Sequence, residues 1–246
     1  METYREAFAV HSYDADAFGA LAVPALCDFL VEAATLHATE LGVPLEALRA
    51  KGLTWVLARA RVDVLAPIRL GDRVEVETWP SGVERLLARR DFRVRGADGA
   101  ELARATTGWS VLDLSTRRPV RPETILLDPR FPPGRLPSVV ELSPRLPELP
   151  AWDEQRRFQV RYQDIDANLH VNNASYVAWA LEAVPRDVWS ACRLAGLEVH
   201  YLAECHHGST ILSRRAAHGD GAFAHAVVRE EDGRELARVA TRWVKR

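Results

Sequence analysis

The chain has 246 residues, of which 48% are hydrophobic and 27% charged, and its formal net charge is −2. This composition is that of an ordinary soluble globular protein, long enough for one large domain or two small ones. A near-neutral charge gives no global basic field for nucleic acid, and no apolar run approaches the ~18 residues of a membrane span. Neither nucleic acid nor a membrane span is therefore expected.

Cysteine usage and the N-terminus indicate a cytoplasmic protein without a cofactor. Cys27, Cys192 and Cys205 are odd in number and far apart, with no CxxC pair and no HExxH segment. No metal or other cofactor is therefore predicted, and reduced thiols are expected. The start, METYREAFAV, lacks the basic flank and long apolar core of a signal peptide.

The first half of the chain predicts a strand, a helix and four further strands. Residues 4–11 alternate as a strand does, and residues 24–40 form an apolar segment whose Pro24 suits the first turn of a helix. Alternating stretches such as RVEVETW follow, and the ADG turn separates the last two strands. Nine of the fourteen prolines then lie between 119 and 150, which predicts an extended linker over residues 116–153 that runs across the surface.

The second half has the same order of elements. A strand is expected over residues 156–163 and an apolar helix over 173–184, which Asn172 or Asn173 can cap. Four strands follow, with the EDG turn before the last one.

The two halves repeat one unit. Residues 98–109, DGAELARATTGW, match residues 232–243, DGRELARVATRW, at eight of twelve positions, and residues 8–33 match 158–183 at an offset of 150. One antiparallel sheet wrapped around one almost wholly apolar helix is the hotdog arrangement. The sequence therefore predicts an α+β tandem double hotdog, with units at 1–115 and 154–246 joined by the linker 116–153.

The repeats differ together at four positions. The loop DIDANLHVNN of the second copy matches DADAFGALAV in the first, and VHYLAECHHG matches VDVLAPIRLG. The second copy has polar, potentially reactive side chains where the first has apolar or inert ones. A loop that only caps a helix has little reason to differ in this way, so the second copy is predicted to be the catalytic one. The pairs are Asn168 with Phe18, His170 with Ala20, Glu204 with Pro67, and Cys205 with Ile68.

These residues carry a resemblance to a known family. The stretch RYQDIDANLHVNNASYVAWALEAVP resembles the signature of acyl-acyl carrier protein (ACP) thioesterases, the plant and bacterial enzymes that end fatty-acid synthesis. The Glu-Cys block in VHYLAEC and the first-half stretch TWVLARARVDVLAPIRLGDRVEVETWPSG are similar to that family as well. One departure is CHHGSTILSRR, where plant members carry a different polar run. The plastid transit segment of plant members is not expected in this protein, because nothing in the sequence resembles one.

The resemblance implies a double hotdog that hydrolyses fatty acyl-ACP to free fatty acid and ACP. It implies that the first copy houses the acyl chain, with Phe18 and Ile68 as apolar lining. An acidic ACP would need a basic dock, for which Arg193, Arg214 and Arg215 are candidates. The sequence is also compatible with a homodimer. The family's active-site positions fall on Asp166, Asn168, His170, Glu204 and Cys205.

Thioester hydrolysis gives each of these residues an expected role. Glu204, arriving from the neighbouring strand and partly buried against the helix 173–184, would be the general base on water. Asn168 would position the water or the carbonyl, and His170 would orient Glu204 or donate to the leaving thiolate. Asp166 would fix the loop by binding Asn168 or backbone N–H groups. Free backbone N–H groups near Val171 or Asn172 would hold the oxyanion.

A second mechanism makes Cys205 the nucleophile, with His170 as base and Asn168 as orienting residue. Neighbours on a strand point to opposite faces, so only one of Glu204 and Cys205 would face the substrate. By the same alternation, His200, His206 and His207 are expected to face solvent or pack rather than to bind a metal.

Rival functions remain open at this point. One is an acyl-CoA thioesterase of the single-hotdog type, with Asp166 as nucleophile or base. Others are a hotdog dehydratase, for which nothing marks a hydroxyacyl site, and a non-catalytic acyl-binding protein.

Overall fold

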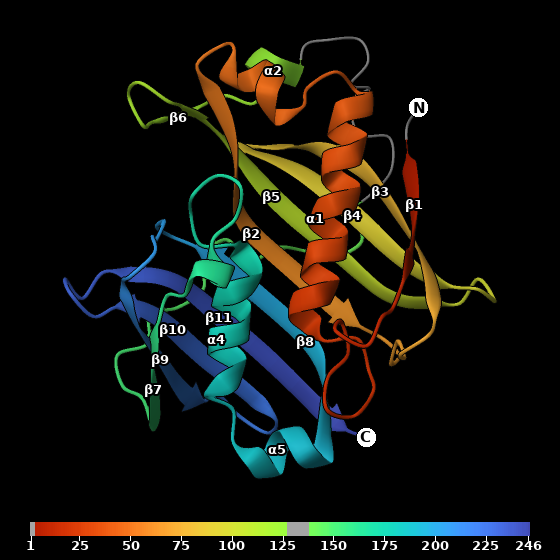
Figure 1. Cartoon of the computed structure of the whole chain (residues 1–246), viewed down its shortest axis with the longest axis vertical. Helices are drawn as coiled ribbons and strands as arrows, with labels where there is room; N and C mark the ends of the chain where they lie inside the picture. Colours follow the sequence, from red (N-terminus) through yellow and green to blue (C-terminus); the bar gives the residue numbers. More distant parts are fainter. Residues whose placement is uncertain (1–2, 127–137) are drawn as a thin grey trace. The chain divides into compact units, whose positions relative to one another are not determined.

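The computed structural model describes residues 3–126 and 138–246, which form two compact units, Met1–Leu142 and Ser143–Arg246. The boundary between the units falls inside the predicted linker 116–153, of which residues 127–137 lie outside the described part of the chain. Each unit is an antiparallel sheet that packs on one long apolar helix (Figure 1). The predicted α+β double hotdog is therefore confirmed.

The first unit has a sheet in the order β1-β3-β4-β5-β2, with the short β6 paired to β5. The expected first strand and helix are present within a few residues. Two short helices were not predicted. The elements are β1 (Tyr4–Ala9), α1 (Val23–Glu40), α2 (Leu45–Arg49), β2 (Leu53–Val64), β3 (Arg73–Glu84), β4 (Leu87–Gly96), β5 (Glu101–Asp113), β6 (Pro119–Val120) and α3 (Glu123–Leu126).

Helix α1 is the central helix of the first unit. A proline stands at its start, where a missing N–H costs nothing, and the helix packs on β1 and β3. Phe8 of β1 stacks on Phe29 of α1 with ring centroids 4.6 Å apart. Beyond its C-terminal end, Leu41, Leu48 and Val111 belong to one buried apolar cluster, so α2 closes that end of the core.

The second unit has a sheet in the order β8-β11-β10-β9-β7. Helix α4 packs on β9, β10 and β11, and Asn172 caps it by accepting the Ala174 N–H at 3.0 Å. The predicted helix 173–184 ends at Glu182 because Pro185 follows closely, and the separate α5 was not predicted. The elements are β7 (Glu154–Gln159), a 3₁₀ turn (Tyr162–Asp164), α4 (Asn173–Glu182), α5 (Arg186–Ala191), β8 (Cys192–Tyr201), β9 (Thr210–Ala217), β10 (Ala222–Arg229) and β11 (Glu235–Lys245). None of the helices in residues 3–126 and 138–246 is long and apolar enough to cross a membrane.

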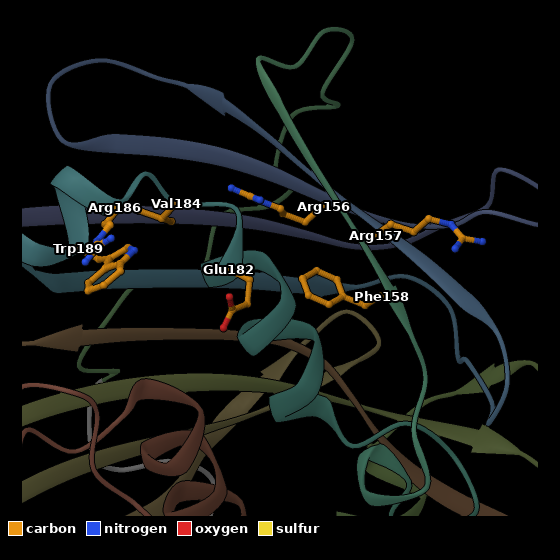
Figure 2. A pocket seen from close by; sticks show the side chains of 7 residues that line it. All are labelled: Arg156, Arg157, Phe158, Glu182, Val184, Arg186 and Trp189. Atoms are coloured by element: carbon orange, nitrogen blue, oxygen red, sulfur yellow. The ribbon is translucent and has the colours of Figure 1, made fainter.

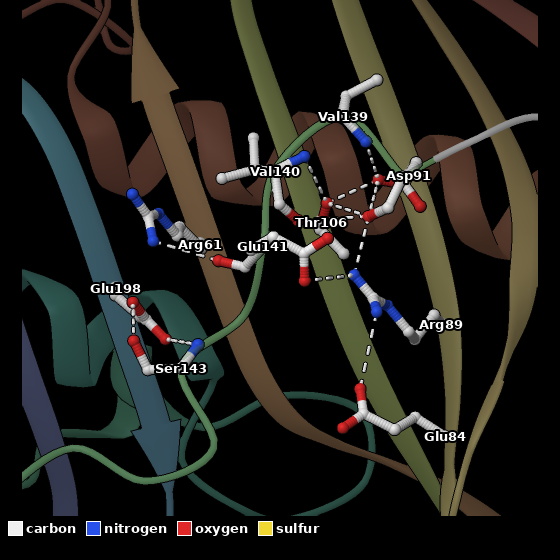
Figure 3. Close-up of polar contacts among 11 residues, drawn as sticks. Arg61, Glu84, Arg89, Asp91, Thr106, Val139, Val140, Glu141, Ser143 and Glu198 are labelled. Atoms are coloured by element: carbon white, nitrogen blue, oxygen red, sulfur yellow. Dashed lines mark hydrogen bonds and ion pairs between the residues drawn. The ribbon is translucent and has the colours of Figure 1, made fainter.

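The predicted linker does not run free across the surface at residues 138–142, because these residues bind to the first unit by hydrogen bonds. Asp91 on β4 is fully buried, and its Oδ1 accepts the Val139 N–H at 2.8 Å and the Ser138 hydroxyl at 2.9 Å (Figure 3). The Val140 N–H donates to Thr106 Oγ1 at 3.2 Å, and Val140 itself is buried. A buried carboxylate needs such donors, so residues 138–140 bind to the first unit's core through Asp91, and Val140 is buried there, while Glu141 is exposed.

Residues 143–146 bind to the second unit, also by hydrogen bonds to buried side chains. Ser143 donates its N–H and its hydroxyl to the carboxylate of buried Glu198, at 2.7 and 2.9 Å (Figure 3). Leu146 is also buried, and its carbonyl accepts from Arg238 at 2.9 Å. His200 is buried too, and its Nε2 lies 3.3 Å from Glu198 Oε1, so this side chain packs inside the second unit.

A buried histidine makes the second unit sensitive to acid. His225 on β10 is 2% exposed, and its Nε2 lies 3.0 Å from Thr241 Oγ1. Burial, and secondarily the charge of Arg215, lower the pKa of His225 to about 3. An unfolded histidine titrates near 6.5, so the unfolded chain takes up this proton first. The contribution to stability is therefore complete above about pH 6.5 and is lost as the pH falls from there toward 3.

We expect His225→Phe to flatten this pH dependence. The repeat places Phe92 of the first unit at the equivalent position, so a phenyl ring suits the site. Between pH 7.5 and 5, the wild type should lose about 1–2 kcal/mol more unfolding free energy than the variant. Denaturant midpoints at the two pH values measure the difference. Equal losses of unfolding free energy in the wild type and the variant would show that His225 does not titrate on unfolding.

Candidate active site

The loop before α4 is organised by Asp166. Its Oδ1 accepts the Asn168 N–H at 2.8 Å and the His170 N–H at 3.4 Å, and its Oδ2 accepts the Asn168 side-chain amide at 3.2 Å. An aspartate that binds the backbone two residues on is a common way to fix such a turn. The contacts predicted for Asp166 are therefore present, and they set the direction of the Asn168 side chain.

The first unit has the same loop without the polar side chains. Asp16 Oδ1 accepts the N–H groups of Phe18 at 2.8 Å and Ala20 at 3.0 Å. The loop backbone is thus common to both copies, and the chemistry of the second copy comes from the side chains at 168 and 170. Phe18 is 38% exposed on this loop, whereas Ile68 is buried.

Leu169 adopts a backbone conformation that favours glycine. Its φ is 63°, and the equivalent residue of the first copy is Gly19, with a φ of 69°. The Leu169 side chain is 77% exposed, so packing does not offset this conformation. A non-glycine residue here costs about 1–2 kcal/mol, while glycine loses about 0.5–1 kcal/mol more backbone entropy on folding.

We therefore expect Leu169→Gly to leave the unfolding free energy unchanged or raise it by up to about 1 kcal/mol. The reciprocal change, Gly19→Leu, should lower it by about 1 kcal/mol, and the two variants are matched controls for each other. Thermal or denaturant unfolding checks both. A clear loss of stability in Leu169→Gly would show that the leucine side chain has a packing role despite its exposure.

Glu204 meets His170. The His170 Nε2 lies 3.2 Å from Glu204 Oε2, and the two side chains are 37% and 42% exposed. One detail of the prediction was wrong. Strand β8 ends at Tyr201, so Glu204 stands in the following loop rather than on the strand. Its side chain is 42% exposed. Water reaches the carboxylate directly.

Cys205 points into the core. It is 0% exposed, and its carbonyl accepts the Val171 N–H at 3.0 Å. Ile68 does the same in the first copy: it is 3% exposed, and its carbonyl accepts the Leu21 N–H at 2.8 Å. As predicted, only one of Glu204 and Cys205 faces His170, although loop geometry rather than strand alternation separates them.

The predicted oxyanion donors are already engaged. The Val171 N–H binds the Cys205 carbonyl, and the Asn172 N–H binds the Asp164 carbonyl at 2.8 Å. The first copy makes the matching bonds from Leu21 and Ala22, so these donors hold the fold. The expectation of free N–H groups at Val171 and Asn172 is therefore wrong, because both are used to join the loop to its neighbours.

His206 is a neighbour of the site that the sequence reasoning missed. Its ring centroid lies 5.0 Å from that of His170, with the ring planes tilted by 47°. The prediction treated residues 206 and 207 as part of a strand, but they lie in the loop after β8. The sequence signal that could have identified it is a histidine two residues after Glu204.

A hollow of about 390 Å³ lies elsewhere in the second unit, beside the C-terminal end of α4 (Figure 2). The catalytic candidates stand before the N-terminal end of α4, about 15 Å away along a ten-residue helix. The hollow is therefore separate from the candidate active site. It is lined by Arg156, Arg157, Phe158, Glu182, Val184, Arg186 and Trp189.

Arg215 does not belong to the predicted docking surface for ACP. Arg215 is 7% exposed, lies 3.3 Å from Asp153 and stacks over Phe223, so it cannot contribute to a docking surface. Arg214 lies over the Trp152 ring at 3.9 Å.

The two tandem hotdog units, with the His170–Glu204 pair at positions that hold Ala20 and Pro67 in the first unit, indicate a double-hotdog thioesterase. Two family models match the chain, the acyl-ACP thioesterase N-terminal domain over residues 1–127 and the C-terminal domain over residues 148–245. The chain belongs to the acyl-ACP thioesterase family.

Relatives match along the whole chain. The chloroplastic oleoyl-acyl carrier protein thioesterase 1 of Arabidopsis thaliana is 27% identical, across 99% of this chain and 76% of that protein. The chloroplastic palmitoyl-acyl carrier protein thioesterase of Cuphea hookeriana is 30% identical, across 98% of this chain and 62% of that protein. The solved structure of the 12:0-ACP thioesterase from Umbellularia californica superposes with a TM-score of 0.89 at 28% identity, covering 100% of this chain and 98% of that one.

Proposed function

We propose that this protein hydrolyses the thioester of fatty acyl-ACP to free fatty acid and ACP, which ends fatty-acid synthesis. The observation that carries the proposal is the 3.2 Å contact between His170 and Glu204, beside the Asp166–Asn168 loop. The matching positions of the first copy hold alanine, proline and phenylalanine, so the second copy carries the site. Family membership points to ACP as the thioester donor.

Glu204 acts as the general base in this proposal. It takes a proton from water, and the resulting hydroxide attacks the thioester carbonyl carbon. His170 holds the carboxylate in place through Nε2. The tetrahedral intermediate then expels the thiolate, which takes the proton from Glu204. No covalent enzyme intermediate is needed, because a thiolate leaves readily.

Asn168 contacts the substrate in this proposal, and Asp166 positions it. The Asn168 amide, anchored on Asp166 Oδ2, meets the carbonyl whose oxygen becomes negative. Asp166 itself already accepts three hydrogen bonds from its own loop. A carboxylate bound in this way is better suited to hold a loop than to act as the nucleophile or base of the rival acyl-CoA thioesterase.

The test compares ACP and CoA thioesters of one acyl chain, with release of free fatty acid as the readout. We expect a higher kcat/KM on the ACP ester and a large loss in His170→Ala with both. A preference for the CoA ester would favour the acyl-CoA thioesterase. Binding of acyl chains without any release would identify a non-catalytic acyl-binding protein.

The first unit, residues 1–115, holds the acyl chain in this proposal, with Phe18 and Ile68 as apolar lining. The support is that this copy keeps the aspartate of the loop but has apolar or inert residues where the second copy has Asn168, His170, Glu204 and Cys205. Phe18→Leu should therefore change the chain-length profile of hydrolysis and keep turnover, measured on an acyl-ACP series. Phe18 is the better choice because truncating buried Ile68 would also open a cavity in the core. A folded but inactive Phe18→Leu would contradict this assignment.

The cytoplasm is the location that this proposal gives the protein. All three cysteines are free thiols, which suits a reducing compartment. Cell fractionation tests the assignment, and recovery of the protein from an oxidising compartment would contradict it.

A further inference from the structure

We propose that His170, Glu204 and His206 bind a divalent transition-metal ion, such as Zn²⁺, and that this ion inhibits the enzyme. The ligating atoms of the three side chains all lie within 4.8 Å of one another. Binding stands on this geometry alone, whereas the inhibition rests on the function proposed for Glu204.

The spacing of the three side chains is close to what zinc needs. Zinc binds imidazole nitrogen at about 2.0–2.1 Å and carboxylate oxygen at about 2.0–2.2 Å, so tetrahedral ligands lie about 3.3–3.5 Å apart. His170 Nε2 and Glu204 Oε2 are already 3.2 Å apart. His206 is exposed in the loop after β8, and its ligating nitrogen lies within 4.8 Å of the ligating atoms of the other two side chains.

The ligand types select the kind of metal. Two imidazoles and one carboxylate suit zinc, cobalt, nickel or copper, whereas magnesium and calcium prefer sites made of oxygen. Three protein ligands leave a fourth position open, as in many accessible zinc sites.

A bound metal would block the reaction because it occupies the groups that the reaction uses. Coordination engages the Glu204 oxygen that would take a proton from water, and it draws His170 Nε2 away from its contact with Glu204. His206 has no part in the proposed hydrolysis. Its replacement should therefore separate metal binding from catalysis.

Direct binding is tested first, on the full-length protein after chelator treatment. Zn²⁺ is titrated by calorimetry, and Co²⁺ is followed by its visible absorption. We expect one ion per chain, at least tenfold weaker binding in His206→Gln, and unchanged binding in His207→Gln. The adjacent His207 is a matched control because it lies outside the cluster. Equal affinity in the wild type and His206→Gln, no binding at all, or a thiolate-to-cobalt absorption band would each overturn the site.

Inhibition is tested with metal-buffered Zn²⁺ in the hydrolysis assay. Fatty acid rather than thiol must be measured, because the product thiol itself binds zinc. The hydrolysis rates of the wild type and His207→Gln should fall at least tenfold with zinc and recover when a chelator is added. His206→Gln should keep its basal activity and resist zinc. Activation by zinc, or equal inhibition of all three proteins, would overturn the inhibitory role. If the chain had no thioesterase activity, the binding experiment would still decide the site, so the two failures are distinguishable.

Discussion

Glu204→Ala should lower kcat by about 10²–10⁴-fold, the usual loss on removing a general base. Cys205→Ala should keep its activity within about tenfold, because the thiol is fully buried in the core while Glu204 contacts His170. The pair of kcat values is the measurement, together with a search for a trapped acyl-enzyme by mass spectrometry. Thermal unfolding of both variants controls for loss of fold.

The opposite pattern would establish a thiol mechanism. An acyl adduct on Cys205, or a folded and inactive Cys205→Ala beside an active Glu204→Ala, would make the cysteine the nucleophile. The first copy argues against this result, because Ile68 occupies the equivalent position with the same burial and the same carbonyl contact.

Asp166→Ala should lower kcat by at least about 10²-fold, because it releases the loop that presents Asn168 and His170. Asp16→Ala is the matched control, since Asp16 makes the same backbone contacts where no catalytic side chain stands. Both variants should lose about 1–2 kcal/mol of unfolding free energy, but only Asp166→Ala should lose activity. Unfolding curves and hydrolysis rates on the two proteins provide the comparison.

Asp166→Asn separates a positioning role from a chemical one. The asparagine oxygen still accepts the two backbone N–H groups, so part of the activity should return relative to Asp166→Ala. A nucleophile or base would not tolerate the loss of its charge. Equal and complete inactivation by alanine and asparagine, with the fold intact, would favour Asp166 as a reacting group.

The internal repeat made the equivalent positions predictable. Aligning the two halves pairs Cys205 with Ile68, and the carbonyls of both accept the N–H of the matching residue, Val171 or Leu21. The αL conformation of Leu169 could have been read from Gly19 in the same alignment. Sequence patterning carries this information because both copies must satisfy the same backbone hydrogen bonds.

The local sequence pattern did not predict features that depend on tertiary contacts, such as the end of β8 and the partners of backbone N–H groups. Nothing in VHYLAECHHG marks the end of β8 at Tyr201, so the sequence predicts that Glu204, Cys205 and His206 lie on the strand. Whether an N–H near a helix start is free depends on which carbonyl lies opposite, and for Val171 that carbonyl belongs to Cys205, over thirty residues away. The burial of Val140 likewise depends on Asp91 and Thr106, which no pattern near residue 140 reveals.

The shared loop backbone explains how one gene duplication can yield two specialised halves. In both copies an aspartate and a pair of main-chain bonds hold the loop, and none of these contacts uses the side chains that differ. Folding and chemistry are therefore encoded at separate positions of the same motif. After duplication, mutation could erase the reactive groups from one copy while its architecture persisted, leaving that copy available to evolve a different task.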